Sequence, residues 1–288
     1  MTRPYFVTQS ALEQFIRSAL AEDIGSGDYS TLATVSENQK GKGILKSKQD
    51  GVIAGVELAK EIFLHIDSSL QVKAIVKDGA IVNSSGIVLE VSGPIRSILM
   101  GERLVLNCLQ RMSGIATHTN KLNKLIAHTK AKVMDTRKTT PNFRLAEKWA
   151  VWIGGGTNHR MGLFDMIMLK DNHIDVCGGV AEAIKKAHNY LKETQQPLDI
   201  EVEARTLHDV ETILGIGGIS VIMLDNMSVG MMKDAVSLIN GKYRTEASGG
   251  ITEDTIVDVA ETGVDFISIG ALTHTVKSLD LNLKLVPS

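Results

Sequence analysis

The chain has 288 residues and a formal net charge of -2, with 43% hydrophobic and 22% charged residues. This composition is typical of a soluble globular protein, and the length allows one large domain or two of ordinary size. The near-neutral charge argues against a partner that needs a basic surface over the whole molecule, such as nucleic acid or an anionic membrane. No uncharged apolar run approaches the length of a bilayer-spanning segment.

The N-terminus and the two cysteines bear on the compartment. The first ten residues lack the apolar core of a secretory signal, so we expect Thr2 to Tyr29 to be mature structure. Cys108 and Cys177 are the two cysteines of the chain, and they imply neither a disulfide framework nor a thiolate zinc site. We therefore expect a reducing, cytoplasmic environment.

The first hundred residues mix helical and β-like segments. The expected elements are a helix capped by Ser10 and running to Glu22, strands over Lys42–Gln49 and within Val72–Val91, and a helix over Ile95–Cys108 that begins after Pro94. This hairpin rhythm also occurs in lipoyl- and biotinyl-type modules. No modifiable lysine occupies a hairpin tip, which argues against such a module.

From about Met112 onward, apolar strands alternate strictly with amphipathic helices. The expected strands end at Met134, Leu169, Val202, Leu224, Ala247 and Ile269. The expected helices include Ile184–Lys192, Leu207–Leu214, Val229–Ile239 and Thr252–Thr262. Successive βα units with right-handed crossovers predict an α/β fold whose parallel sheet curls into a six-stranded barrel, smaller than the eight-stranded form.

Polar residues follow each of these strands. They are Asp135 to Lys138, Lys170 to His173, the pair Glu201 and Glu203 around Val202, Asp225 and Asn226, Ser248 to Gly250, and Gly270, Ala271 and His274. In a βα barrel these positions converge on the carboxyl end of the strands, where active sites are built. Solvated strand ends are the plain alternative. We favour a site because Arg137, Lys138 and Lys170 adjoin apolar strands.

The stretch between Arg137 and Lys170 is locally basic. Its cations are Arg137, Lys138, Arg144, Lys148, Arg160 and Lys170, set against Glu147 and Asp165, with His159 in addition. Such an excess in a partly buried position indicates a small anionic ligand. A nucleic-acid groove would need more interleaved aromatic residues than Trp149 and Trp152, which we expect to pack within a helix over Leu145–Ile153. On that helix we expect Lys148 to be solvated.

Two glycine turns near the end of the chain suit a phosphate. Ser248-Gly249-Gly250 precedes the helix expected to open at Thr252, and Gly270-Ala271 precedes Thr273. Backbone amides at such turns bind phosphates in many barrels. The run Gly154 to Gly156 is instead expected to end a helix.

The sequence offers hard oxygen ligands rather than a transition-metal motif. No HExxH pattern or paired Cys/His spacing is present. Glu203 and Asp225 are suited to Mg²⁺ or to sugar hydroxyls.

Seven motifs, in this order, resemble the quinolinate phosphoribosyltransferase family. They are DTRKTTPNFR (135–144), GGGTNHR (154–160), LKDNH (169–173), EVE (201–203), LDN (224–226), EASGGI (246–251) and ISIGALTH (267–274). The resemblance extends upstream to ALAEDIGSGDYST (19–31) and ERLVLNCLQRMSGIAT (102–117), so it covers nearly the whole chain.

The resemblance implies a two-domain chain and a homodimer. Residues 1–111, joined by 275–288, would form an N-terminal α/β sandwich domain, and residues 112–274 would form the catalytic α/β barrel. In the family's dimer the first domain of one subunit covers the barrel mouth of the other. Arg103 would therefore act in the partner's site.

The resemblance also implies a reaction. Quinolinate and phosphoribosyl pyrophosphate would give nicotinate mononucleotide, pyrophosphate and CO₂ with Mg²⁺, in de novo NAD biosynthesis. Quinolinate would be bound by Arg103, Arg137, His159 and Arg160, and the mixed carboxylate and pyrophosphate region by Lys138 and Lys170. Glu203 and Asp225 would hold the ribose and Mg²⁺ and, with the two lysines, form the catalytic set. The 5′-phosphate would be held by Ser248, Gly249, Gly250, Gly270, Ala271 and His274.

One residue departs from the family pattern, and some alternatives stay open. Asn142 stands where glycine is expected, although asparagine tolerates a left-handed backbone. A molybdenum-transport-associated pyrophosphorylase or a nicotinate phosphoribosyltransferase would share the barrel, but the arginines for a second carboxylate favour quinolinate. A Schiff-base aldolase using Lys138 or Lys170, and a non-catalytic anion-binding protein, are the alternatives from other classes.

Overall fold

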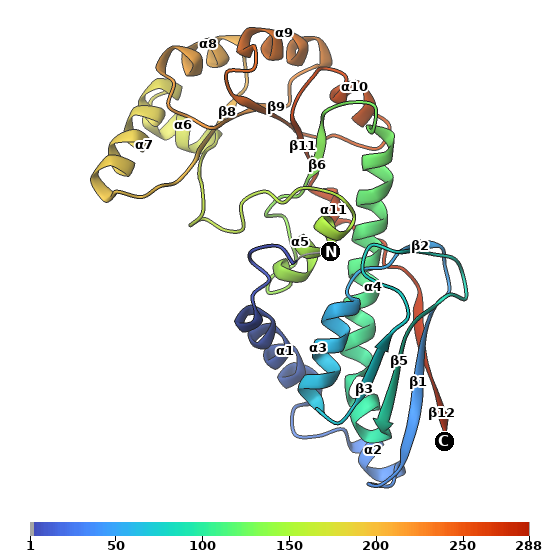
Figure 1. Ribbon diagram of the computed structural model, residues 1–288. Coiled ribbons are helices and arrows are strands. Elements are labelled where there is room, and N and C mark those ends of the chain that lie inside the picture. Colours follow the sequence, from blue (N-terminus) through green and yellow to red (C-terminus); the bar gives the residue numbers. More distant parts are fainter. Residues whose placement is uncertain (1–2, 288) are drawn as a thin grey trace. The chain divides into compact units, whose positions relative to one another are not determined.

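The computed structural model describes residues 3–287, and its contacts divide the chain into two compact units. Unit 1 comprises Met1–Asn120, Lys138–Gly155 and Ala271–Ser288, and unit 2 comprises Lys121–Arg137 and Gly156–Gly270. Figure 1 shows both units. The chain thus crosses between the units several times, and the segment after Arg137 packs with unit 1.

Unit 1 is built around an antiparallel sheet with the strand order β12-β1-β5-β3. Its strands are β1 (Lys40–Ser47), β3 (Gln71–Ala74), β5 (Ile87–Pro94) and β12 (Leu281–Pro287), and a separate pair is formed by β2 (Gly51–Val52) and β4 (Ile81–Val82). The end of the chain therefore returns to the sheet of the first hundred residues. Its partner is β1, in a register that sets Ser47 opposite Leu281.

The helices of unit 1 agree with the sequence in place and differ at their ends. They are α1 (Gln9–Ile24), α2 (Tyr29–Thr34), α3 (Val56–Ile66), α4 (Ile95–Leu125), which continues into unit 2, α5 (Arg144–Ile153) and α11 (Ala271–His274). The expected cap of α1 at Ser10 is wrong, because the Thr8 hydroxyl accepts from the amide of Ala11 at 3.2 Å. The helix starting at Ile95 is 31 residues long, far past Cys108.

Two glycines of β1 let α4 approach the sheet closely. A Cβ atom at Gly41 would lie 2.9 Å from the side chain of Ile95, and one at Gly43 would lie 3.4 Å from that of Ile98. Both isoleucines are buried. Glycine at these positions therefore allows the start of α4 to lie against β1.

Unit 2 contains the parallel sheet that the sequence predicts, with the strand order β6-β11-β10-β9-β8-β7. Its strands are β6 (Lys132–Met134), β7 (Ile167–Leu169), β8 (Ile200–Ala204), β9 (Val221–Asp225), β10 (Arg244–Ser248) and β11 (Phe266–Ser268). Each expected strand end is confirmed to within two residues. The mixed α/β fold with a six-stranded parallel sheet is likewise confirmed.

The free edge of β6 is occupied by an extended residue. Among the described residues, β6 and β7 form the two ends of the sheet order. Thr157 pairs with β6 through its amide, which donates to Val133 O at 2.8 Å, and its carbonyl, which accepts from Asp135 N at 3.1 Å. This pairing fixes the backbone immediately before His159.

Helices form an outer layer on the curved sheet of unit 2, which Figure 1 shows for α8 outside β8 and α9 outside β9. They are α6 (Asp171–Cys177), α7 (Val180–Thr194), α8 (Leu207–Ile216), α9 (Val229–Ile239) and α10 (Ile256–Ala260). The expected helix from Thr252 is wrong at its start, because Thr252 to Thr255 form a turn and the helix begins at Ile256.

Candidate active site

The inner face of the parallel sheet carries acidic side chains inside otherwise apolar strands. Alternation along β8 sets Glu201 and Glu203 on one face, on either side of the fully buried Val202. Met223 of β9 is in register with both Glu203 and Glu246, so these two glutamates share that face. Strand pairing thus gathers carboxylates that lie far apart in the sequence.

Glu203 and Asp225, expected to be the acidic pair, do lie close together. Burial raises the pKa of Glu203, and the negative charges of Asp225 and Asp171 raise it further, while Lys170 acts in the opposite direction. The structure therefore groups three of the expected site residues, Lys170, Glu203 and Asp225, at the ends of β7, β8 and β9. The mutual repulsion of the carboxylates suits a bound cation.

Arg137 and Arg160 form a basic pair in the same unit. Burial lowers the pKa of the Arg160 guanidinium, and the positive charge of Arg137 lowers it further. Glu201 and Asp165 offset this only in part. Two guanidinium groups near one another and partly out of water form a place where an anion is stabilised.

Arg160 is also held by the loop that follows it. Its Nη1 donates to the carbonyl of Met166 at 3.1 Å. Asp165 caps the turn between them by accepting from the amides of Met161 and Gly162 at 2.6 and 3.0 Å. The guanidinium is therefore oriented by the structure rather than extended into solvent.

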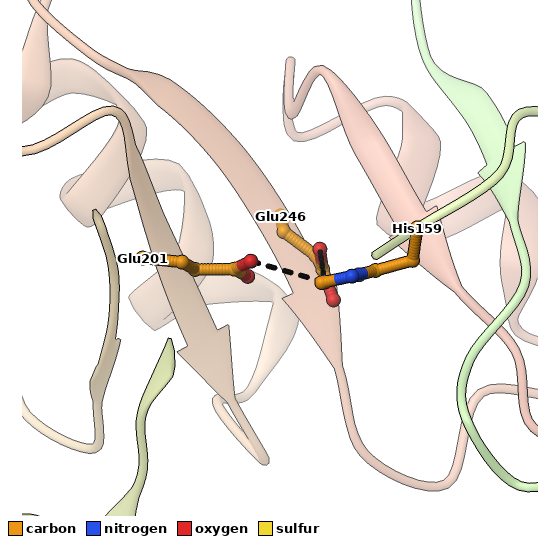
Figure 2. A group of neighbouring side chains, drawn as sticks. All are labelled: His159, Glu201 and Glu246. Atoms are coloured by element: carbon orange, nitrogen blue, oxygen red, sulfur yellow. Dashed lines mark ion pairs between the residues drawn. The ribbon is translucent and has the colours of Figure 1, made fainter. Parts of the chain in front are cut away.

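The ring of His159 points its tip at two buried glutamates, as Figure 2 shows. Its Nε2 is 3.0 Å from Glu201 Oε2 and 3.3 Å from Glu246 Oε2, and all three side chains are at most 6% exposed. Burial lowers the pKa of the His159 imidazole, but the two carboxylates outweigh it and raise the pKa to about 9. Burial and the nearby Glu246 raise the pKa of Glu201 to about 7.

The sequence assigns no individual role to three carboxylates around His159. Glu201 shares one strand face with Glu203, Asp135 is one of the polar residues that follow the strand ending at Met134, and Glu246 belongs to a longer motif. Asp135 is fully buried and accepts from His159 N at 2.9 Å. The available signal was an acidic residue inside or directly after an apolar strand.

The turn after β10 requires glycine. Gly249 has a φ of +104° and Gly250 one of +61°. A Cβ atom at Gly249 would clash with the side chain of Asn226, and the backbone amide of Asn226 donates to Ser248 O at 2.9 Å. The turn is therefore closed against the end of β9, with its amides set before α10. Gly270, in turn, lies two residues after the end of β11 and directly precedes α11.

The remaining expected site residues, Arg103, Lys138, Ala271 and His274, belong to unit 1. Arg103 is an exposed residue of α4. The Lys138 carbonyl accepts from the Thr273 hydroxyl at 2.8 Å, and His274 Nδ1 is 2.7 Å from the Thr275 hydroxyl. These contacts join the segment that carries Lys138 to α11.

A buried polar network fixes that segment within unit 1. Arg111 Nε donates to the fully buried Glu147 at 2.7 Å, and Arg111 Nη2 donates to the Thr140 hydroxyl at 2.9 Å and to the Thr273 carbonyl at 3.0 Å. The other oxygen of Glu147 accepts from Thr140 N at 3.0 Å. The Arg111 guanidinium thus joins α4 to Glu147 of α5 and to Thr273 of α11.

The expectation that Lys148 is solvated is wrong. The residue is fully buried, because α5 is enclosed on most of its surface from Ala146 to Val151. Trp149 is core, as expected, whereas Trp152 is 38% exposed. Gly154 ends the helix, and Asn142 adopts the left-handed backbone that its sequence position suggested, with a φ of +61°.

Comparison with known proteins places this geometry in a family. The model of the quinolinate phosphoribosyl transferase N-terminal domain matches residues 28–113, and that of its C-terminal domain matches 115–284. A chloroplastic nicotinate-nucleotide pyrophosphorylase [carboxylating] of Arabidopsis thaliana is 47% identical over 95% of this chain and 82% of its own. A probable nicotinate-nucleotide pyrophosphorylase [carboxylating] of Bacillus subtilis is 40% identical over 96% and 94%.

A solved structure agrees in fold as well as in sequence. The crystal structure of NadC from Streptococcus pyogenes is 40% identical, covers 99% of this chain and 100% of its own, and superposes with a TM-score of 0.92. Matches to both domain models and to full-length relatives leave no large part of the chain unaccounted for. The chain therefore belongs to the quinolinate phosphoribosyltransferase family.

Proposed function

We propose that the chain transfers the phosphoribosyl group of phosphoribosyl pyrophosphate to quinolinate and releases CO₂. The products are nicotinate mononucleotide and pyrophosphate, in de novo NAD biosynthesis. The observation that carries this proposal is the basic pair formed by Arg137 and Arg160, in which burial and the charge of Arg137 both disfavour the Arg160 cation. Quinolinate has two carboxylates, and a planar guanidinium binds a carboxylate through two parallel hydrogen bonds.

The acidic pair acts on the other substrate. Departure of pyrophosphate leaves positive charge on the ribose ring, and the carboxylates of Glu203 and Asp225 stabilise that charge or accept from the ribose hydroxyls. Lys170, near Glu203, supplies positive charge for the leaving pyrophosphate. Lys138, next to Arg137 in the chain, has the same role in this proposal.

Glu203 and Asp225 also fit Mg²⁺. Two neighbouring carboxylates that repel one another, one of them with a raised pKa, are the hard oxygen donors that this ion prefers. When bound, Mg²⁺ would neutralise charge that develops on the pyrophosphate.

The turns hold the 5′-phosphate in this proposal. Ser248, Gly249 and Gly250 offer amides in a turn closed by Asn226. Gly270, Ala271 and His274 offer a second anchor. Loss of CO₂ needs no obligate acid from the protein, because the positively charged pyridinium nitrogen stabilises the carbanion that develops next to it, and that carbon then takes a proton from water.

The first test is an assay with purified protein. Quinolinate, phosphoribosyl pyrophosphate and Mg²⁺ are mixed, and nicotinate mononucleotide and CO₂ are followed together. We expect both products in equal amounts, and no turnover when EDTA replaces Mg²⁺. Turnover of nicotinate in place of quinolinate would reject the proposed substrate.

We further propose a homodimer in which Arg103 completes the site of the neighbouring subunit. Arg103 is exposed on α4, so its guanidinium is accessible to a second chain. Arg103→Ala and Arg137→Ala should each be inactive, and mixed dimers of the two should regain about a quarter to a half of the activity, since one site of each heterodimer keeps both arginines. A mixture that stays inactive after subunit exchange, shown by mass spectrometry, would reject a shared site.

A cytoplasmic location is part of the proposal. Both cysteines are free thiols, as a reducing compartment allows. No helix over residues 3–287 is long and apolar enough to cross a membrane. Because relatives are named as chloroplastic and mitochondrial, fractionation of the source cells is the direct check.

A further inference from the structure

Three buried carboxylates converge on one short segment of unit 2. Asp135 follows β6, Glu201 lies in β8 and Glu246 lies in β10, and none of them is more than 1% exposed. A buried carboxylate is costly unless the fold supplies its partners. Their shared partner is the dipeptide Asn158-His159.

Each carboxylate holds a different group of that dipeptide. Asp135 accepts from the side-chain amide of Asn158 at 2.6 Å and from the backbone amide of His159 at 2.9 Å. Glu201 and Glu246 lie 3.0 and 3.3 Å from Nε2 of the His159 ring (Figure 2). The backbone of this segment is therefore held from the end of β6, and the His159 ring is held from β8 and β10.

The other ring nitrogen of His159 faces the next residue. The backbone amide of Arg160 donates to His159 Nδ1 at 2.6 Å. With Nδ1 as acceptor, the ring proton is on Nε2 and points at the two glutamates. The two carboxylates favour a second ring proton, on Nδ1, whereas the Arg160 amide disfavours it because it donates to that nitrogen. In both the neutral and the charged ring, Nε2 carries a proton.

This proton argues against a metal ion in the cluster. The ligand atoms of His159, Glu201 and Glu246 lie within 4.8 Å of one another, which would be close enough. A metal bound at Nε2 needs the lone pair of that nitrogen, and then Nδ1 carries the proton and donates it. Here Nδ1 accepts instead, so the geometry is that of a clamp formed by two close ion-pair contacts at Nε2 and one hydrogen bond at Nδ1.

We propose that Glu201 and Glu246, acting through His159, and Asp135, acting through the adjoining backbone, are positioning residues for the Arg160 guanidinium. They do not touch the substrate. They fix the backbone on one side of Arg160, and its bond to Met166 fixes the side chain on the other. This inference rests on the proposed function, because it assumes that Arg160 binds a carboxylate of quinolinate.

The test compares Glu201→Gln and Glu246→Gln with Glu261→Gln. Glutamine keeps the shape and one acceptor but removes the charge. Glu261 is the matched control, because its Oε1 lies 3.1 Å from His128 Nε2 while both side chains are 54% exposed. We expect kcat/KM for quinolinate to fall about 10- to 100-fold in each buried variant, as for other groups that orient a ligand-binding side chain. The control should stay within about twofold.

The loss should be specific to one substrate. We expect the KM for quinolinate to rise and the KM for phosphoribosyl pyrophosphate to stay within about twofold, because the clamp holds Arg160 and not Glu203 or Asp225. An unchanged KM for quinolinate, or an equal rise for both substrates, would overturn the proposal.

A second measurement covers a variant that fails to fold. In wild-type protein, the ¹⁵N signals of the His159 ring, assigned by their absence in His159→Gln, should show a protonated Nε2 at neutral pH whose proton exchanges slowly with water because the ring is buried. A ring with bare Nε2 would overturn the clamp. Wild-type turnover of quinolinate is measured first. If it is absent, the proposed function fails, and the ring spectrum still decides whether the clamp exists.

Discussion

Arg111 in unit 1 and Arg160 in unit 2 are both partly buried arginines, but Arg111 is paired with a carboxylate whereas Arg160 lies near another arginine. Arg111 binds the buried carboxylate of Glu147 at 2.7 Å and two further oxygens. Arg160 lies near Arg137, and burial and that neighbouring cation lower its pKa. A cation paired with a buried acid holds the fold together, whereas a cation set beside another cation is poised for an anion from outside.

The strongest test of the first half of this comparison is Glu147→Ala. It leaves Arg111 and the Thr140 amide without their acceptor, so the free energy of unfolding should fall by about 3–5 kcal/mol. Urea denaturation followed by circular dichroism measures this. As control, Glu182→Ala removes an exposed pair with Lys185 and should leave the urea midpoint unchanged. Equal stability of the two variants would mean that the network has no structural role.

Arg160→Ala tests the other half. The variant should lose about 2–5 kcal/mol of transition-state binding, which is roughly 30- to 5000-fold in kcat/KM for quinolinate. Its urea midpoint should not fall, because a repulsion with Arg137 is removed. Arg17→Ala, which breaks an exposed 3.8 Å pair with Glu13, should keep wild-type kinetics. Loss of stability without loss of activity would reverse the assignment of the two arginines.

Gly249→Ala extends the comparison from charge to backbone. The added Cβ clashes with the Asn226 side chain at a φ of +104°, so we expect a cost of about 1–3 kcal/mol and weaker binding of phosphoribosyl pyrophosphate. Gly241 is the control, because it has a φ of +71° and a Cβ added there would have no atom within 4 Å. Gly241→Ala therefore introduces the backbone strain without the clash. Thermal unfolding of both variants separates the two contributions, and equal losses would remove the argument from close packing.

Glu203→Gln should separate stability from activity. Burial and the neighbouring carboxylates raise the pKa of Glu203, so its charge destabilises the fold at pH 7 and ceases to do so as the pH falls and the group is protonated. We expect the variant to gain about 0.5 kcal/mol at pH 7, allowing for screening, and to lose turnover. The gain should shrink on acidification. A destabilised variant at pH 7 would contradict the repulsion.

The smallest effect is expected at Asn142. Asn142 has a φ of +61°, a backbone conformation that glycine adopts freely and alanine does not. Asn142→Gly should therefore change the free energy of unfolding by less than about 0.5 kcal/mol, whereas Asn142→Ala should lower it by about 1 kcal/mol. Comparing the two variants by urea denaturation tests whether asparagine serves here as a substitute for glycine. A stable alanine variant would show that the left-handed backbone carries no penalty at this position.

Local pattern in the sequence was enough to predict the strand ends of unit 2. Apolar runs ending at Met134, Leu169 and Leu224 are short, and each is followed by polar residues. Neighbouring residues alone therefore indicate where each strand ends. The left-handed backbone at Asn142 and the helix end at Gly154 were predictable for the same reason. The motifs then identified the family that the comparisons established.

Three details were decided only by the tertiary structure. Lys148 is buried because α5 is enclosed on most of its surface, and the helical periodicity of α5 does not indicate this. The late start of the helix expected from Thr252, and the length of α4, were likewise not indicated by helical periodicity. Helix boundaries and burial are therefore the weaker part of a prediction from sequence.

The basic segment and the acidic strand residues were visible in the sequence, but their pairing was not. Periodicity set Glu201 and Glu203 on one face of β8, because side chains alternate along any strand. It could not show that His159 pairs with both Glu201 and Glu246, or that Glu203 lies near Asp225. Those contacts depend on the order and register of the strands, which are settled by the packing of the whole sheet and not by neighbouring residues in the chain.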